Sequence, residues 1–72
     1  MWNKQLEIYL YIVTEKKWMT ILVKETMNFK LILEQLNLRD MYVYEYISNQ
    51  MCDEDLSLQA LKVRNGMIFM IY

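Results

Sequence analysis

In this 72-residue chain, apolar residues first recur at every second position, then at helical spacing, and then again at every second position. Residues 6–13 and 18–24 are rich in strand-forming residues that alternate along the chain, which is typical of β-strands. The polar residues 14–17 separate them and predict a β-hairpin. Residues 29–36 then carry an apolar stripe at helical spacing. The chain therefore supplies one short helix to cover one face of a sheet.

The ends of the helix and the next strand have local signals of their own. Asn28 is a good helix cap, because its side-chain oxygen can accept a hydrogen bond from an early helix N–H. Residues 42–47 alternate again and predict a third strand. After a turn at residues 48–50, Met51 is interpreted as the start of a brief fourth strand.

The last third of the chain predicts a capped turn and a final strand. Ser57 is a candidate cap for a short turn that inserts apolar side chains into the core. These are Leu58, Leu61 and Val63. Gly66, the single glycine, is expected to reverse the chain because glycine accepts positive φ without a steric clash. Residues 67–72 are all apolar or aromatic and predict the last strand.

The composition argues against several classes of function. Net charge is −1 and the eight Lys and Arg residues are dispersed, so we expect no nucleic-acid binding. Histidine is absent, and the three carboxylates after Cys52 disfavour a reactive thiolate there. Residues 53–55 are interpreted as a solvated acidic loop. We therefore predict no enzymatic activity, no cofactor and no metal site.

The length, the cysteine content and the apolar runs predict a cytoplasmic protein of one domain, residues 1–72. A single cysteine excludes an internal disulfide framework and is typical of a reducing compartment. No secretory signal is visible in the sequence. The longest apolar runs are far shorter than the ~20 residues that cross a bilayer, so we expect no direct membrane insertion.

A sheet covered by a single helix has one face that remains open to partners. We predict that Ile68 and Met70 face the helix together with Tyr44 and Tyr46. The opposite face would then bind a partner protein or a second copy of the chain, because exposed apolar surfaces mark interaction sites. The predicted protein-binding residues are Tyr9, Tyr11, Val43, Ile47, Phe69 and Ile71, with Trp18 at the edge. A slip of one residue exchanges the two faces, and the register of residues 42–47 stays open.

The spacing of the apolar positions resembles that of the ubiquitin-type β-grasp. The positions that carry this resemblance are Met19, Ile21, Val23, the cap Asn28, Phe29, Ile32 and Leu36, followed by the turn after Ser57. The closing sequence VRNGMIFMIY is similar to that of the small bacterial ubiquitin-like proteins of the YukD/EsaB type, which accompany type VII secretion systems. The resemblance implies an α+β fold with a mixed four- to five-stranded sheet and one short helix on one face. It also implies that the last strand lies in the middle of the sheet, between the first and third strands.

The resemblance also implies a function. It points to a non-catalytic interaction module, an accessory or regulatory component of a type VII secretion apparatus that uses its sheet face to bind proteins. Three alternatives are a self-associating structural protein, a phage-type inhibitor of a host protein, and a sulfur carrier. The carriers of thiamin and molybdopterin synthesis end in a flexible Gly-Gly, whereas this sequence ends with Tyr72, which disfavours the carrier.

Overall fold

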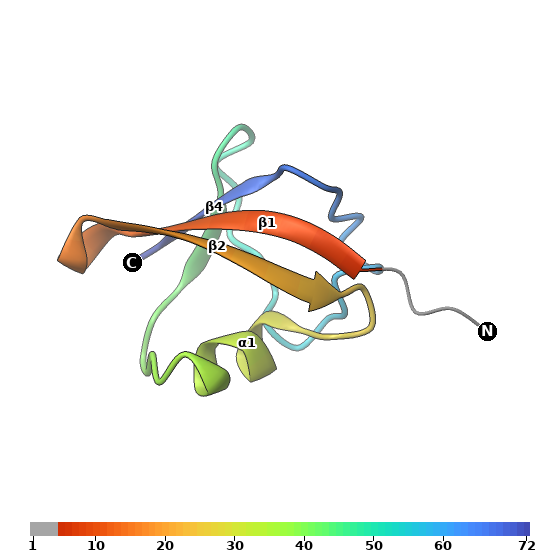
Figure 1. Cartoon of the computed structure of the whole chain (residues 1–72), viewed down its shortest axis with the longest axis horizontal. Coiled ribbons are helices and arrows are strands. Elements are labelled where there is room, and N and C mark those ends of the chain that lie inside the picture. Colours follow the sequence, from red (N-terminus) through yellow and green to blue (C-terminus); the bar gives the residue numbers. More distant parts are fainter. Residues whose placement is uncertain (1–4) are drawn as a thin grey trace.

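The computed structural model describes residues 5–72 as a twisted sheet with one helix beneath it (Figure 1). The elements are β1 (Gln5–Ile12), the 3-10 helix η1 (Val13–Glu15), β2 (Lys17–Lys24), α1 (Phe29–Gln35), β3 (Val43–Glu45) and β4 (Ile68–Ile71). The strand order in the sheet is β2-β1-β4-β3. β1 pairs antiparallel with β2 and parallel with β4, while β3 pairs antiparallel with β4.

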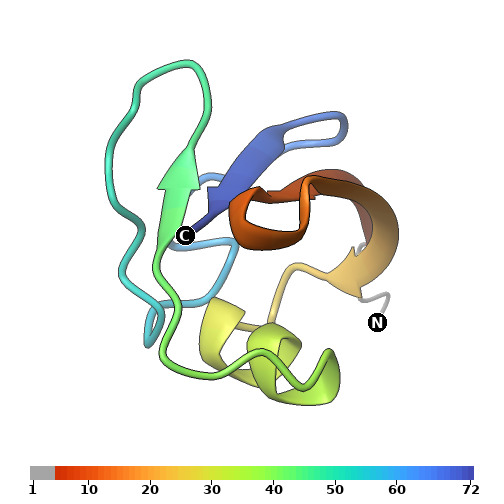
Figure 2. The ribbon, with the colours of Figure 1, turned by 90° about the vertical axis from the view of Figure 1, so that its left-hand side faces the viewer.

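The expected α+β architecture is confirmed: the sheet is mixed, has four strands, and carries α1 on one face (Figure 2). The last strand is central, as predicted, with β1 on one side and β3 on the other. Two local details differ from the prediction. The hairpin loop contains η1, and Lys16, which follows η1, has a positive φ of 51°. Met51 makes only an isolated bridge to Tyr44 and starts no strand.

The three local signals in the connecting segments are confirmed. The backbone N–H of Leu31 donates to the Asn28 side-chain oxygen at 2.9 Å, which caps α1. The N–H of Ala60 donates to the Ser57 hydroxyl at 3.0 Å. Gly66 has φ 81°, and its N–H donates to the carbonyl of Glu7 at 2.8 Å. The turn before β4 is thereby attached to β1, which sets where β4 enters the sheet.

The hydrophobic core lies between the sheet and α1. Its buried members are Leu6, Ile8, Leu10, Ile12, Val23, Phe29, Ile32, Leu33, Val43, Leu58, Val63, Phe69 and Ile71. Leu58 is held in place by its own N–H, which donates to the carbonyl of Met27 at 2.8 Å. The predicted insertion of the turn after Ser57 into the core is confirmed by the burial of Leu58 and Val63, with Leu61 packed against them.

The predicted facing of the last two strands is wrong. Phe69 is 1% exposed and Ile71 is fully buried, whereas Ile68 and Met70 are only half-buried and lie outside the core cluster. Val43 is also fully buried. The cause is the pairing of β4 with β1, which sets Phe69 beside the buried Leu10. Neighbouring residues on adjacent strands project to the same face of a sheet.

Candidate protein-binding surface

The sheet face opposite α1 carries a row of large side chains that crosses all four strands. Trp18 on β2 lies opposite Tyr11 on β1, and Tyr11 lies opposite Met70 on β4. Met70 in turn lies opposite Tyr44 on β3. Tyr11, Tyr44 and Met70 each alternate with a buried neighbour, such as Ile71 beside Met70, and Trp18 lies opposite Tyr11, so the row points away from the helix. We call these four residues the outer row.

Each aromatic ring of the outer row packs against another ring, either within the row or beside it. The ring centroids of Tyr11 and Trp18 are 4.9 Å apart, and the rings are tilted by 51°. Tyr44 meets Tyr72 edge-on, with centroids 5.3 Å apart. Aromatic pairs in these geometries attract each other beyond the area they bury. The row is therefore a preassembled surface, and binding against it would cost little side-chain entropy.

Further side chains extend the surface along the strands. Tyr9 lies between Thr20 and Ile68 in the next row. The Tyr9 hydroxyl donates to a Glu7 carboxylate oxygen at 3.1 Å, and this bond with the charge of Glu7 raises the pKa of Tyr9. At the opposite end, Tyr42 exchanges two backbone hydrogen bonds of 2.9 Å with Tyr72. A shallow hollow there is lined by Tyr42, Tyr44, Asn49 and Tyr72.

The predicted site residues fall into three groups. Tyr9 and Tyr11 lie on the outer face, as expected, because they alternate with buried Ile8 and Leu10. Ile47 is 88% exposed but lies in the turn that follows β3, outside the sheet. The remaining three predicted residues belong to the core and not to the surface. They are Val43, Phe69 and Ile71.

Three residues of this face were missed by the sequence analysis: Tyr44, Ile68 and Met70. Every position from 67 to 72 is apolar, so Ile68 and Met70 carry no polar mark of the outer face, and the register of residues 42–47 was open for Tyr44. One signal was present. Val43 is a β-branched aliphatic residue between tyrosines, and such a residue suits a closed core better than a tyrosine, whose hydroxyl needs a partner.

Glu45 explains why β3 is short and why Ile47 leaves the sheet. Its two carboxylate oxygens accept hydrogen bonds from the backbone N–H groups of Ile47 and Ser48, each at 2.8 Å. These bonds turn the chain directly after β3. They also favour the charged carboxylate and hold the pKa of Glu45 below its usual value.

Cys52 lies near this turn, and its surroundings disfavour the thiolate. Burial raises the pKa of its thiol, and the charge of Glu45 raises it further, although a backbone hydrogen bond at Glu45 partly opposes the shift. The direction is the one expected from the sequence, but the causes are burial and Glu45 instead of the carboxylates of residues 53–55. Within residues 5–72, no group of three His, Cys, Asp or Glu side chains is arranged to hold a metal ion. Also within this range, no helix has the length and apolar character needed to cross a bilayer.

No family model matches the chain, and no curated protein matches its sequence. Solved structures do match. A de novo designed protein based on ubiquitin superposes with a TM-score of 0.74 at 18% identity, covering 94% of this chain and 87% of that one. The NMR structure of the ubiquitin-like domain of an Arabidopsis thaliana protein gives a TM-score of 0.77 at 12% identity, covering 96% and 77%.

The chain has the ubiquitin-like fold. A third match is to a chain in a crystal structure of a pParkin–pUb–UbcH7 complex, with a TM-score of 0.66 at 14% identity. It covers 93% of this chain and 22% of that one, so the resemblance is to a part of a larger protein. The β-grasp predicted from the spacing of buried residues is thus confirmed, although the sequence identities are low.

Proposed function

We propose that this ubiquitin-like chain is a non-catalytic module that binds a partner protein through the outer row and its neighbours. The outer row carries the proposal. Trp18, Tyr11, Met70 and Tyr44 form one continuous apolar strip on a face that no other element of residues 5–72 covers. Tyr and Trp are enriched among residues that dominate binding energies, because they bury a large area with few rotatable bonds.

The partner expected for this strip is a protein with an apolar patch of matching size. The strip itself carries no charged side chain, so its centre is suited to a dry contact. Glu7 and Lys24 lie on the same face toward one end of β1 and β2, because they alternate with buried Leu6 and Val23. A polar rim at that end would position a partner while the aromatic strip supplies most of the affinity.

The narrower assignment is an accessory or regulatory role in a bacterial type VII secretion system, in the cytoplasm. Its support is the similarity of residues 63–72 to the YukD/EsaB-type ending. A phage-type inhibitor of a host protein would use the same outer row. The genes that neighbour the coding sequence distinguish these two: secretion components support the first, and phage structural or replication genes support the second.

The binding proposal is tested by comparing the wild type and three variants as baits in extracts of the native host. Met70→Ser and Tyr44→Ser alter the outer row, and Glu34→Ser alters the exposed side of α1 as a matched control. A protein captured by the wild type and the control but lost with both outer-row variants is the expected result. Calorimetry with that purified protein should then show at least a tenfold loss of affinity, as for a hot-spot residue. A partner that is lost with the helix control and retained by the outer-row variants contradicts the proposal.

A further inference from the structure

Among residues 5–72, no strand pairs with the outer edge of β2, so this edge offers unpaired backbone groups. The N–H of Tyr9 donates to the carbonyl of Met67, and the carbonyl of Glu7 accepts from Gly66, so the odd-numbered residues of β1 point their backbone toward β4. The even-numbered residues of β1 therefore bond to their β2 partners, for example Ile8 to Ile21. It follows that Trp18, Thr20 and Leu22 direct their N–H and C=O groups away from the sheet.

This edge is also apolar. Leu22 is 63% exposed and Trp18 is 60% exposed. Beside β2, a groove runs between the strand and α1, with apolar lining from Ile21, Val23, Met27, Leu31, Ile32 and Leu36. Leu31 on its rim is exposed as well. A long edge strand with open backbone groups and adjoining apolar surface is a template for pairing with another strand.

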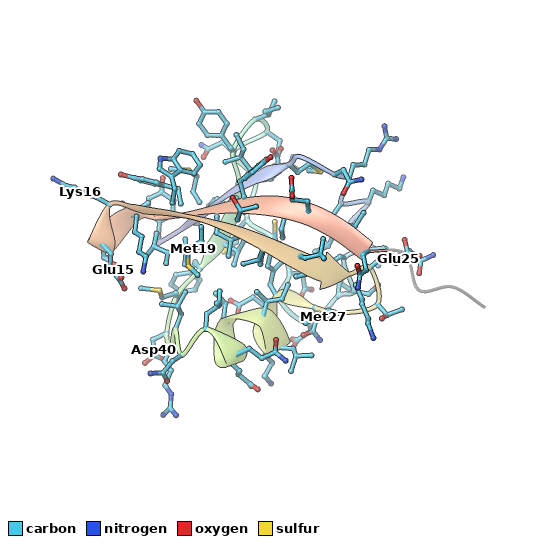
Figure 3. All side chains as sticks on the ribbon, in the orientation of Figure 1. Glu15, Lys16, Met19, Glu25, Met27 and Asp40 are labelled. Carbon is cyan, nitrogen blue, oxygen red and sulfur yellow. The ribbon has the colours of Figure 1, made fainter. Side chains whose placement is uncertain are left out.

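The charges at the two ends of β2 indicate which strand fits. Figure 3 shows Glu15 and Lys16 at one end of the hairpin and Glu25 at the other end of β2. Lys17 begins the strand and Glu25 follows its last residue. When two copies of β2 run antiparallel, Lys17 at the beginning of each copy lies near Glu25 at the end of the other. We propose that β2 pairs with β2 of a second copy about a twofold axis and joins the two sheets into one.

The direction of the backbone groups restricts the register of this pairing. In an antiparallel ladder, the N–H and C=O groups of two residues that face each other either both point toward the partner strand or both point away from it. Two registers keep most of the strand paired. With Thr20 opposite Thr20, Lys16 faces Lys24 of the second copy, and like charges in this position repel. With Ile21 opposite Ile21, the like charges are separated.

The second register places complementary groups together. Lys17 then faces Glu25 of the second copy, and this is a pair without mutual backbone bonds, in which side chains are closest. Trp18 faces Lys24 of the second copy on the outer face, where the cation can lie over the indole ring. The twofold axis repeats each contact, so one substitution changes two contacts. Leu22 faces Thr20 of the second copy, so its side chain gains a neighbour and loses part of its exposure.

The proposal is tested by sedimentation of the full chain across a range of concentrations. The wild type should dimerise in a concentration-dependent way. Lys17→Glu and Glu25→Lys should each raise the dimer dissociation constant at least about tenfold, because each brings two like-charged pairs together. An equimolar mixture of the two variants should recover the dimer, because every contact is then again between opposite charges. Circular dichroism checks that each variant is folded.

Thr20→Pro tests the backbone pairing separately. Its N–H points away from β1, so proline at this edge position leaves the monomer sheet bonded, but it removes a donor from the dimer. Thr20→Val keeps the donor and is the matched control. The dimer should be lost with proline and kept with valine.

Three results overturn the proposal. The first is a wild type that stays monomeric at all concentrations. This result would overturn the proposal even if the groove beside β2 bound an extended apolar peptide. The second is a dimer that survives Thr20→Pro, which would place the interface elsewhere. The third is a mixture of the two charge variants that stays monomeric. The dimer and the proposed function can be tested separately. Met70→Ser alters the outer row but leaves the β2 edge unchanged, so it should not affect the dimer.

Discussion

Phe69 meets Phe29 edge-on between the sheet and the helix, with ring centroids 4.8 Å apart and ring planes at 61°. Phe29 is the first residue of α1 and Phe69 lies in the central strand β4. Both side chains are buried. This contact joins the capped start of the helix to the middle of the sheet, and it determines which face of β4 belongs to the core.

The two faces of β4 should respond differently to substitution. Phe69→Ala removes a buried ring and should lower the free energy of unfolding by about 3–5 kcal/mol. Met70→Ser acts on the outer face and should cost less than about 1 kcal/mol. Urea unfolding of both variants gives the comparison. Equal losses would show that the outer face of β4 contributes to the core after all.

The turn after Ser57 should show a similar contrast. Leu58 is fully buried, so Leu58→Ala should lower the free energy of unfolding by about 2–5 kcal/mol. Leu61 is only partly buried and packs against the core from outside, so Leu61→Ala should cost clearly less. Thermal melting ranks the two variants. A larger loss for Leu61 than for Leu58 would contradict the observed orientation of this turn.

Gly66 should tolerate asparagine better than valine. Its φ of 81° lies in the left-handed region, and an added Cβ would meet no atom within 4 Å. Any cost is therefore backbone strain, about 1–2 kcal/mol for Gly66→Val. Gly66→Asn should cost less, because asparagine adopts this conformation more readily. Chemical denaturation of the two variants tests this, and a loss of the same size for both would indicate a steric cause instead.

Acid should weaken the domain partly through Glu45. Its pKa is lowered in the folded state by the N–H groups of Ile47 and Ser48. The unfolded chain therefore binds this proton first as pH falls. The stabilisation is complete above the ordinary glutamate pKa of about 4.3 and is lost as pH drops through the lower folded value.

Glu45→Gln removes this titration, so its stability should depend less on pH as the pH falls below the ordinary glutamate pKa. Melting temperatures of the wild type and the variant at matched pH values provide the measurement. Glu34→Gln changes an exposed glutamate on α1 and leaves the Glu45 hydrogen bonds in place, so this control should follow the wild type. Parallel curves for the wild type and Glu45→Gln would refute the role of these hydrogen bonds.

The order of the main elements, the start of the helix and the two turns follow from the sequence because they depend on local chemistry. The capping of α1 by Asn28, the capped turn at Ser57 and the positive φ of Gly66 each involve residues within a few positions of one another. Tyr9 and Tyr11 could be placed on the outer face for a related reason. Their strand contains Glu7, a polar residue that marks which side faces solvent.

The facing of β4 and β3 could not be read in this way and was decided by the tertiary structure. Residues 67–72 are apolar at every position, so either face could have been the buried one. The choice comes from the parallel pairing that sets Phe69 beside Leu10, and from Phe29 beneath them. Val43 follows because it pairs with the buried Ile71. A strand that is apolar on both sides takes its orientation from the neighbours it packs against, and these come from distant parts of the chain.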